Sequence, residues 1–106
     1  MQHMTPLQLQ RYLAHTHQPP LLLDVREPWE YAICHLPNVT LVPMQQIPRQ
    51  ALTFDRAQEF VVICHHGVRS FQVAAYLERL GFTRVVNLTG GMDAWAKQVE
   101  PSMPTY

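Results

Sequence analysis

The stretch that decides the fold is Phe60-Val61-Val62-Ile63-Cys64-His65-His66-Gly67-Val68-Arg69-Ser70. It joins four consecutive apolar residues to a cysteine and a short polar loop. From about Arg69 to Leu80, apolar residues then recur at helical spacing. A continuous apolar run of this length is typical of a strand buried on both faces of a parallel sheet. The stretch therefore predicts a strand, a tight turn and a helix in succession, with Cys64 where the strand ends.

The same alternation of apolar runs and helical segments fills the rest of the chain. Further strands are expected at residues 21–25, 40–42 and 85–88, and further helices at residues 5–14, 28–33, 44–52 and 92–98. Short apolar strands that alternate with helices predict an α/β fold wound around a mainly parallel sheet. Ligands of such sheets bind beyond the carboxyl ends of the strands, which directs attention to the turn after Ile63.

Composition narrows the classes of function. The 106 residues, 47% of them hydrophobic, predict one domain spanning 1–106. With 8 basic and 8 acidic side chains, the chain has no basic stripe for a run of phosphates, so we expect no nucleic-acid partner. We expect no membrane partner either, because no stretch approaches the ~20 apolar residues of a membrane span. The N-terminal residues lack an export signal, so the expected location is cytoplasmic.

The two cysteines, Cys34 and Cys64, are too few for a disulfide framework. A cysteine between a strand and a helix start faces backbone N–H groups and the helix dipole, which stabilise a thiolate and make it nucleophilic. Arg69 and the Ser70 hydroxyl would add donors for an anionic substrate. The alternative is that Cys64 is a small buried apolar residue. A core position, however, does not need the polar neighbours that follow it, whereas an anion-binding loop does.

The run from Cys64 to Ser70 resembles the active-site loop of the rhodanese sulfurtransferases. The resemblance extends over nearly the whole chain, through the segments Leu23-Asp24-Val25-Arg26, Glu30-Tyr31, His35-Leu36-Pro37, Gly81-Phe82, Asn87-Leu88 and Gly90-Gly91, with Trp95 and an ending through Pro101, Pro104 and Tyr106. Each segment alone is a weak indication of the family, but all of them in the same order make the resemblance specific.

This resemblance implies a rhodanese fold, with a five-stranded, mainly parallel sheet flanked by helices on both faces and an additional short strand near Gln2–Met4. It also implies that the Cys64 thiolate attacks the outer sulfur of thiosulfate or a related persulfide donor, such that sulfite leaves and a Cys64 persulfide remains. A thiol, a protein or cyanide then accepts the sulfur. Backbone N–H groups of His65, His66, Gly67, Val68, Arg69 and Ser70 would hold the donor and the persulfide. No cofactor is implied.

Loop length separates related chemistries within this resemblance. From Cys64 to Arg69 the loop has six residues, which resembles the sulfurtransferases. Related phosphatases and arsenate reductases have one residue more, for a tetrahedral oxyanion. Sulfur transfer is thus favoured over phosphate chemistry, and a non-catalytic rhodanese-like binding or regulatory module remains an alternative.

Cys34 departs from the family pattern, which has glycine immediately before the His-Leu-Pro segment. Glycine there suggests a positive backbone angle or close packing. Cys34 is either a thiol without a redox role or a resolving thiol that pairs with Cys64 or accepts its persulfide.

Several other residues are open to both a structural and a functional interpretation. Asp24 and Arg26 end a strand on the ligand side and either shape the pocket or form a structural pair, with Arg26 able to reach Glu30 at i,i+4 spacing. Cys64, His65 and His66 are not expected to bind metal, because such a loop turns neighbouring side chains apart and no fourth ligand is evident. Three aromatic residues, Trp29, Tyr31 and Trp95, are expected to be core or packing residues.

Overall fold

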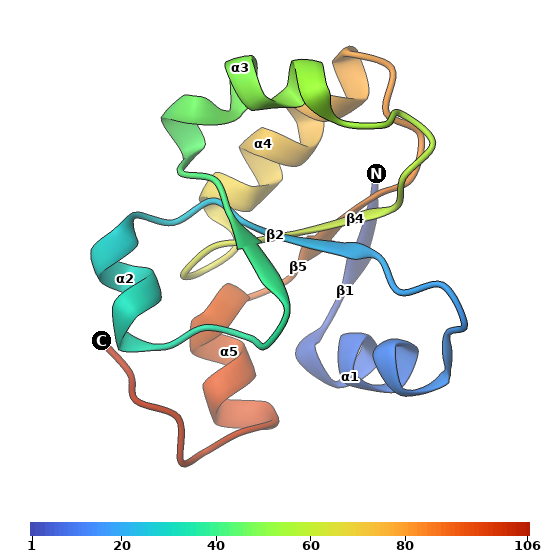
Figure 1. The fold of residues 1–106 in the computed structure, drawn as a ribbon. Coiled ribbons are helices and arrows are strands. Elements are labelled where there is room, and N and C mark those ends of the chain that lie inside the picture. Colours follow the sequence, from blue (N-terminus) through green and yellow to red (C-terminus); the bar gives the residue numbers. More distant parts are fainter.

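The computed structural model describes residues 1–106 and contains one five-stranded sheet (Figure 1). The strands are β1 (Gln2–Met4), β2 (Leu21–Asp24), β3 (Val39–Leu41), β4 (Phe60–Ile63) and β5 (Val85–Leu88), in the order β1-β5-β4-β2-β3. All neighbouring pairs are parallel. The predicted α/β fold is confirmed, including the short strand at Gln2–Met4.

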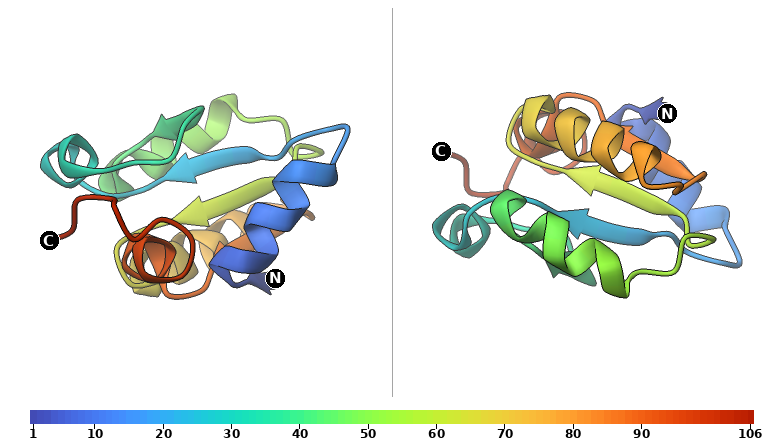
Figure 2. Two further views of the ribbon diagram at one scale, coloured as in Figure 1. Left: turned by 90° about the horizontal axis from the view of Figure 1, so that it is seen from below. Right: turned by 90° about the horizontal axis from the view of Figure 1, so that it is seen from above.

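Helices cover both faces of the sheet, as predicted. The helices are α1 (Pro6–His15), α2 (Pro28–Ile33), α3 (Ile47–Gln50), α4 (Val68–Arg79) and α5 (Gly91–Gln98), and short 3-10 turns flank α3 at Met44–Gln46 and Ala51–Thr53. Figures 1 and 2 show α3 and α4 on one face and α1 and α5 on the other, with α2 beyond one end of the sheet. The helix expected at 44–52 is therefore a chain of three short helical turns.

The alternation of side chains along β4 divides the core into two layers. Phe60 and Val62 pack with Val73 and Leu77 of α4 on one face. Val61 and Ile63 point to the other face, where residues of α1 and α5 cover them. Because β4 is central and buried on both faces, its sequence is a continuous apolar run rather than an alternating one.

The ends of the elements follow local sequence signals. At the start of α1, the Thr5 hydroxyl accepts a hydrogen bond from the Gln8 N–H at 3.2 Å, and the Gln8 side chain accepts one from the Thr5 N–H at 2.9 Å. This capping box, followed by Pro6, confirms the expected helix start. Strand β3 begins at Val39, one residue before the expected position.

Trp29 is not a core residue, because 60% of its surface is exposed. It lies on α2, outside the two helical layers, and its ring meets Tyr106 edge-on with centroids 5.5 Å apart. Trp95 is buried as expected, and Tyr31 is half-buried against His35. No helix in the structure has both the length and the apolar content that a membrane crossing requires.

Candidate active site

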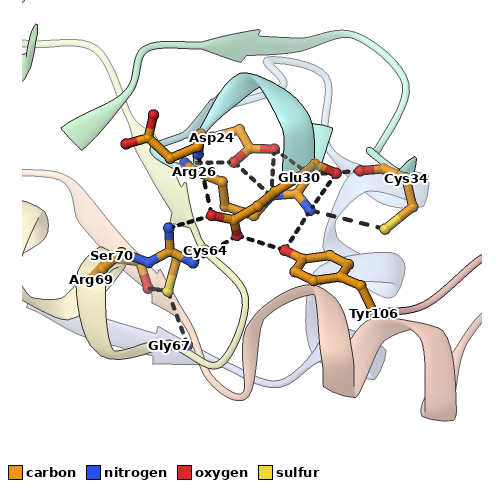
Figure 3. A network of polar contacts seen from close by, with 10 residues as sticks. Asp24, Arg26, Glu30, Cys34, Cys64, Gly67, Arg69, Ser70 and Tyr106 are labelled. Carbon is orange, nitrogen blue, oxygen red and sulfur yellow. Dashed lines mark hydrogen bonds and ion pairs between the residues drawn. The ribbon is translucent and has the colours of Figure 1, made fainter. Parts of the chain in front are cut away.

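Cys64 follows β4 directly and lies at the carboxyl end of the sheet. Its side chain is buried, with 1% of its surface exposed. The Gly67 N–H donates a hydrogen bond to the Cys64 Sγ at 3.0 Å, and the Ser70 Oγ lies 3.3 Å from the same sulfur (Figure 3). A backbone donor aimed at a buried sulfur stabilises negative charge on it.

Backbone hydrogen bonds join the loop that begins at Cys64 to the first turn of α5. The Met92 N–H donates to the Cys64 carbonyl at 2.8 Å, and the Asp93 N–H donates to the His65 carbonyl at 3.0 Å. This approach requires glycine at position 91, because a Cβ there would lie 2.3 Å from the Cys64 carbonyl oxygen. Gly91 also has a φ of +58°, in the left-handed region. The Gly90-Gly91 pair thus fixes the position of the Cys64 backbone.

Ser70 links the sulfur to the neighbouring strand β5. Its hydroxyl donates to Asn87 Oδ1 at 2.5 Å, so its oxygen is left to accept from the Cys64 thiol. The sequence predicted that Ser70 donates to an anionic substrate, whereas here its single proton is directed to Asn87. Sequence reasoning assigned no site role to Asn87. The available signal was a polar residue inside the apolar run Val85-Val86-Asn87-Leu88.

Arg69 is also engaged within the protein rather than free for a substrate. Its Nη1 and Nη2 donate to the two carboxylate oxygens of Glu30 at 2.7 and 2.8 Å. Tyr106 donates a third hydrogen bond to Glu30 Oε2 at 2.7 Å. Burial of Glu30 would raise its pKa, but the hydrogen bonds from Arg69 and Tyr106 outweigh burial and lower this pKa to about 2. Glu30 is therefore ionised at neutral pH.

Asp24 and Arg26 form a buried ion pair with three hydrogen bonds between 2.7 and 3.1 Å. Arg26 has no exposed surface and also donates to the Cys34 carbonyl at 2.6 Å. Burial would lower the pKa of Arg26, yet the hydrogen bonds with Asp24 and Tyr106 raise it. The expected pairing of Arg26 with the Glu30 side chain is wrong: Arg26 reaches only the Glu30 carbonyl, at 3.4 Å, because Asp24 lies nearer to its guanidinium. The Asp24–Arg26 pair thus connects the end of β2 to Cys34, which directly follows α2.

Cys34 is a buried free thiol at the other end of this network. Its sulfur lies 3.9 Å from Arg26 Nη1. Figure 3 shows Glu30 and Tyr106 between the sulfur atoms of Cys34 and Cys64. The φ of Cys34 is −161°, an extended conformation open to any residue, so the backbone here does not require the glycine of the family pattern.

The two loop histidines lie beside each other and differ in exposure. The His65 ring stacks on Tyr106, with centroids 4.1 Å apart. Burial and the neighbouring His66 lower the pKa of His65, which keeps its ring uncharged at neutral pH. His66 is exposed and lies 3.8 Å from an Asp93 oxygen. His65, His66 and Asp93 bring one potential metal ligand each within 4.8 Å of one another, a different group from the one considered in the sequence. The remaining loop residue, Val68, is 66% exposed.

Comparisons with known proteins agree with this architecture. The family model of the rhodanese-like domain matches residues 5–98. A protein named Sulfurtransferase from Allochromatium vinosum is 40% identical over 81 residues, which cover 76% of this chain and 76% of that protein. Rhodanese-like/PpiC domain-containing protein 12, chloroplastic, from Arabidopsis thaliana is 40% identical over 89 residues, and the match covers 80% of this chain but only 30% of that protein.

A solved structure has the same fold. The rhodanese-like domain protein from Staphylococcus aureus superposes with a TM-score of 0.83 at 37% identity, covering 90% of this chain and 91% of that one. The parallel sheet, the cysteine loop at the end of its central strand and the matches along the sequence lead to one conclusion: the chain belongs to the rhodanese-like domain family.

Proposed function

We propose that this protein is a sulfurtransferase that carries sulfur as a persulfide on Cys64. The observation that supports this function most directly is the position of the Cys64 sulfur. It lies at the carboxyl end of the central strand and receives the Gly67 N–H at 3.0 Å. The loop from Cys64 to Arg69 has six residues, the length that resembles the sulfurtransferases rather than the related phosphatases, and a relative of 40% identity is named a sulfurtransferase.

In the first half-reaction, the Cys64 thiolate attacks the outer sulfur of thiosulfate or of a persulfide donor. The new bond joins Cys64 Sγ to that sulfur, while the donor's sulfur–sulfur bond breaks and its electron pair leaves on sulfite or on a thiolate. The Gly67 N–H stabilises the charge on sulfur, together with the other backbone N–H groups of the loop. In the second half-reaction, a thiol, a protein acceptor or cyanide attacks the outer sulfur and releases the Cys64 thiolate.

The test is the intact mass of the protein after brief exposure to thiosulfate or to an organic persulfide, without reductant. We expect the wild type and Cys34→Ser to gain one sulfur atom, and cyanide to remove it. Cys64→Ser should gain none. Cys34→Ser is the matched control, because it removes the only other thiol.

Two results would overturn the proposal. A wild-type protein that gains sulfur from neither donor would point to the non-catalytic binding module. Loss of two hydrogen atoms in the wild type, together with no sulfur gain in Cys34→Ser, would show that Cys34 and Cys64 pair without a persulfide.

A further inference from the structure

Arg69 is the cation of the cysteine loop, yet its charge is already matched within the protein. The Glu30 carboxylate receives two parallel hydrogen bonds from it, at 2.7 and 2.8 Å, the two-pronged geometry that arginine forms with carboxylates. The Glu30 side chain is 5% exposed and the Arg69 side chain 33%. The pair is thus largely shielded from water, and an ion pair that is shielded in this way is screened only weakly by salt.

Tyr106 holds this pair in place. Arg26 Nη1 donates to the Tyr106 oxygen at 3.1 Å, so the phenol proton is free to be donated to Glu30 Oε2. Glu30 therefore accepts three hydrogen bonds from two side chains. Rotating it away from Arg69 would leave a buried carboxylate with fewer partners, which is costly.

The other charges of the network provide no spare cation. Arg26 is matched by Asp24, and Arg69 by Glu30 (Figure 3). Lys97 of α5 is paired with Asp93 at 3.0 Å. A small dianion that approaches Cys64 must therefore compete with Glu30 for Arg69 or remain without an ion-pair partner.

Building on the proposed function, we propose that Glu30 is a specificity-determining residue: it disfavours thiosulfate, whose sulfonate is charged, and favours organic persulfides as sulfur donors. The favoured step is Cys64–S⁻ + R–S–SH → Cys64–S–SH + R–S⁻. One sulfur–sulfur bond forms and one breaks, and the electron pair leaves on the donor's thiolate. No sulfonate needs a cation in this step, so Arg69 stays with Glu30.

The experiment compares two donors in the same preparation, thiosulfate and freshly generated 2-hydroxyethyl persulfide. The measured quantity is the ratio of the rates at which Cys64 gains sulfur from them. This ratio does not depend on the fraction of protein that is folded, so a destabilised variant still gives a valid result. Glu30→Gln should raise the ratio of thiosulfate to persulfide by roughly tenfold or more, since one hydrogen bond to a charged group is worth at least that factor.

Glu27→Gln is the matched control. It removes the same charge three residues earlier, and Glu27 forms no ion pair in the structure. Its donor ratio should stay within about twofold of the wild type, because the contact of Glu27 with Glu30 is made by its backbone N–H, at 3.4 Å, and glutamine keeps that donor. A ratio unchanged in Glu30→Gln, or raised equally in Glu27→Gln, would overturn the inference. Failure of the wild type to gain sulfur from either donor would instead overturn the proposed function.

Discussion

Replacing Gly91 by alanine should slow the reaction of Cys64 without unfolding the protein. The new Cβ would lie 2.3 Å from the Cys64 carbonyl oxygen and 2.5 Å from that of His65. Because real Cβ contacts do not fall below 3.0 Å, the loop and α5 must separate by about 0.7 Å, the difference between 3.0 and 2.3. A displacement near 1 Å at a reacting group costs roughly 100-fold in rate. We therefore expect Gly91→Ala to slow sulfur gain by Cys64 by roughly ten- to hundredfold.

Gly81→Ala provides the control for backbone strain. Gly81 also has a positive φ, +99°, but a Cβ there would meet only the flexible Arg56 side chain, at 3.4 Å. Both variants should lose about 1–2 kcal/mol of unfolding free energy for an alanine in the left-handed region, measured by urea unfolding. Gly91→Ala should lose more than Gly81→Ala, because only its Cβ meets backbone atoms. Only Gly91→Ala should lose activity, measured as the rate of mass gain per folded molecule. Equal rates in the two variants would refute the argument that Gly91 positions the loop.

Three further predictions concern the polar network. The pKa of Glu30 falls from an ordinary 4.5 to about 2 on folding. The ionised Glu30 therefore contributes up to roughly 3 kcal/mol to the free energy of unfolding, and this contribution is complete above pH 4.5 and lost as the pH falls to 2. When urea unfolding is measured at a series of pH values, the free energy of unfolding should fall less steeply towards acid pH in Glu30→Gln than in the wild type. The same dependence on pH in both proteins would contradict this. Asp24→Asn leaves Arg26 buried without a counter-charge and should cost about 3–5 kcal/mol, seen as a lower melting temperature; a change below about 1 kcal/mol would argue against the pair's importance. Asn87→Leu frees the Ser70 proton to donate to Cys64, so alkylation of Cys64 by iodoacetamide at fixed pH should accelerate. It should not accelerate when Ser70 is also replaced by alanine. Acceleration in both cases would show that Ser70 does not transmit the effect of Asn87 to Cys64.

The sheet could be predicted because its central strands are buried on both faces and therefore read as continuous apolar runs. The edge strand β1 has three residues with no more than partial burial, too short to show a periodicity. Only the resemblance of the whole chain to a family indicated it. The position of β3 was one residue off, since Val39 is half-buried and polar Thr40 lies inside the strand.

The position of Cys64 between a strand, a loop and a helix could be predicted because these residues are contiguous in sequence. Their partners could not, because Arg69 and Glu30 are 39 residues apart and Tyr106 and Glu30 are 76 apart. Spacing rules describe only near neighbours, so they paired Arg26 with Glu30 along a helix. In the folded chain, Glu30 instead faces the loop of a different strand. The roles of Glu30 and Tyr106 thus depend on tertiary contacts that no local pattern encodes.

The pairing of β1 with β5 also constrains the order in which the protein folds. Met4 is in register with Leu88, so β1 finds its partner only after the chain between these two strands has been made. At ~5–20 residues per second, this delay lasts several seconds. Until then β5 is absent and β4 has only β2 as a neighbour. The edge of β4 that β5 will occupy is exposed during this interval, and contacts so distant in sequence slow folding. The sheet of this domain should therefore be complete only after β5 has been made and has paired with β1.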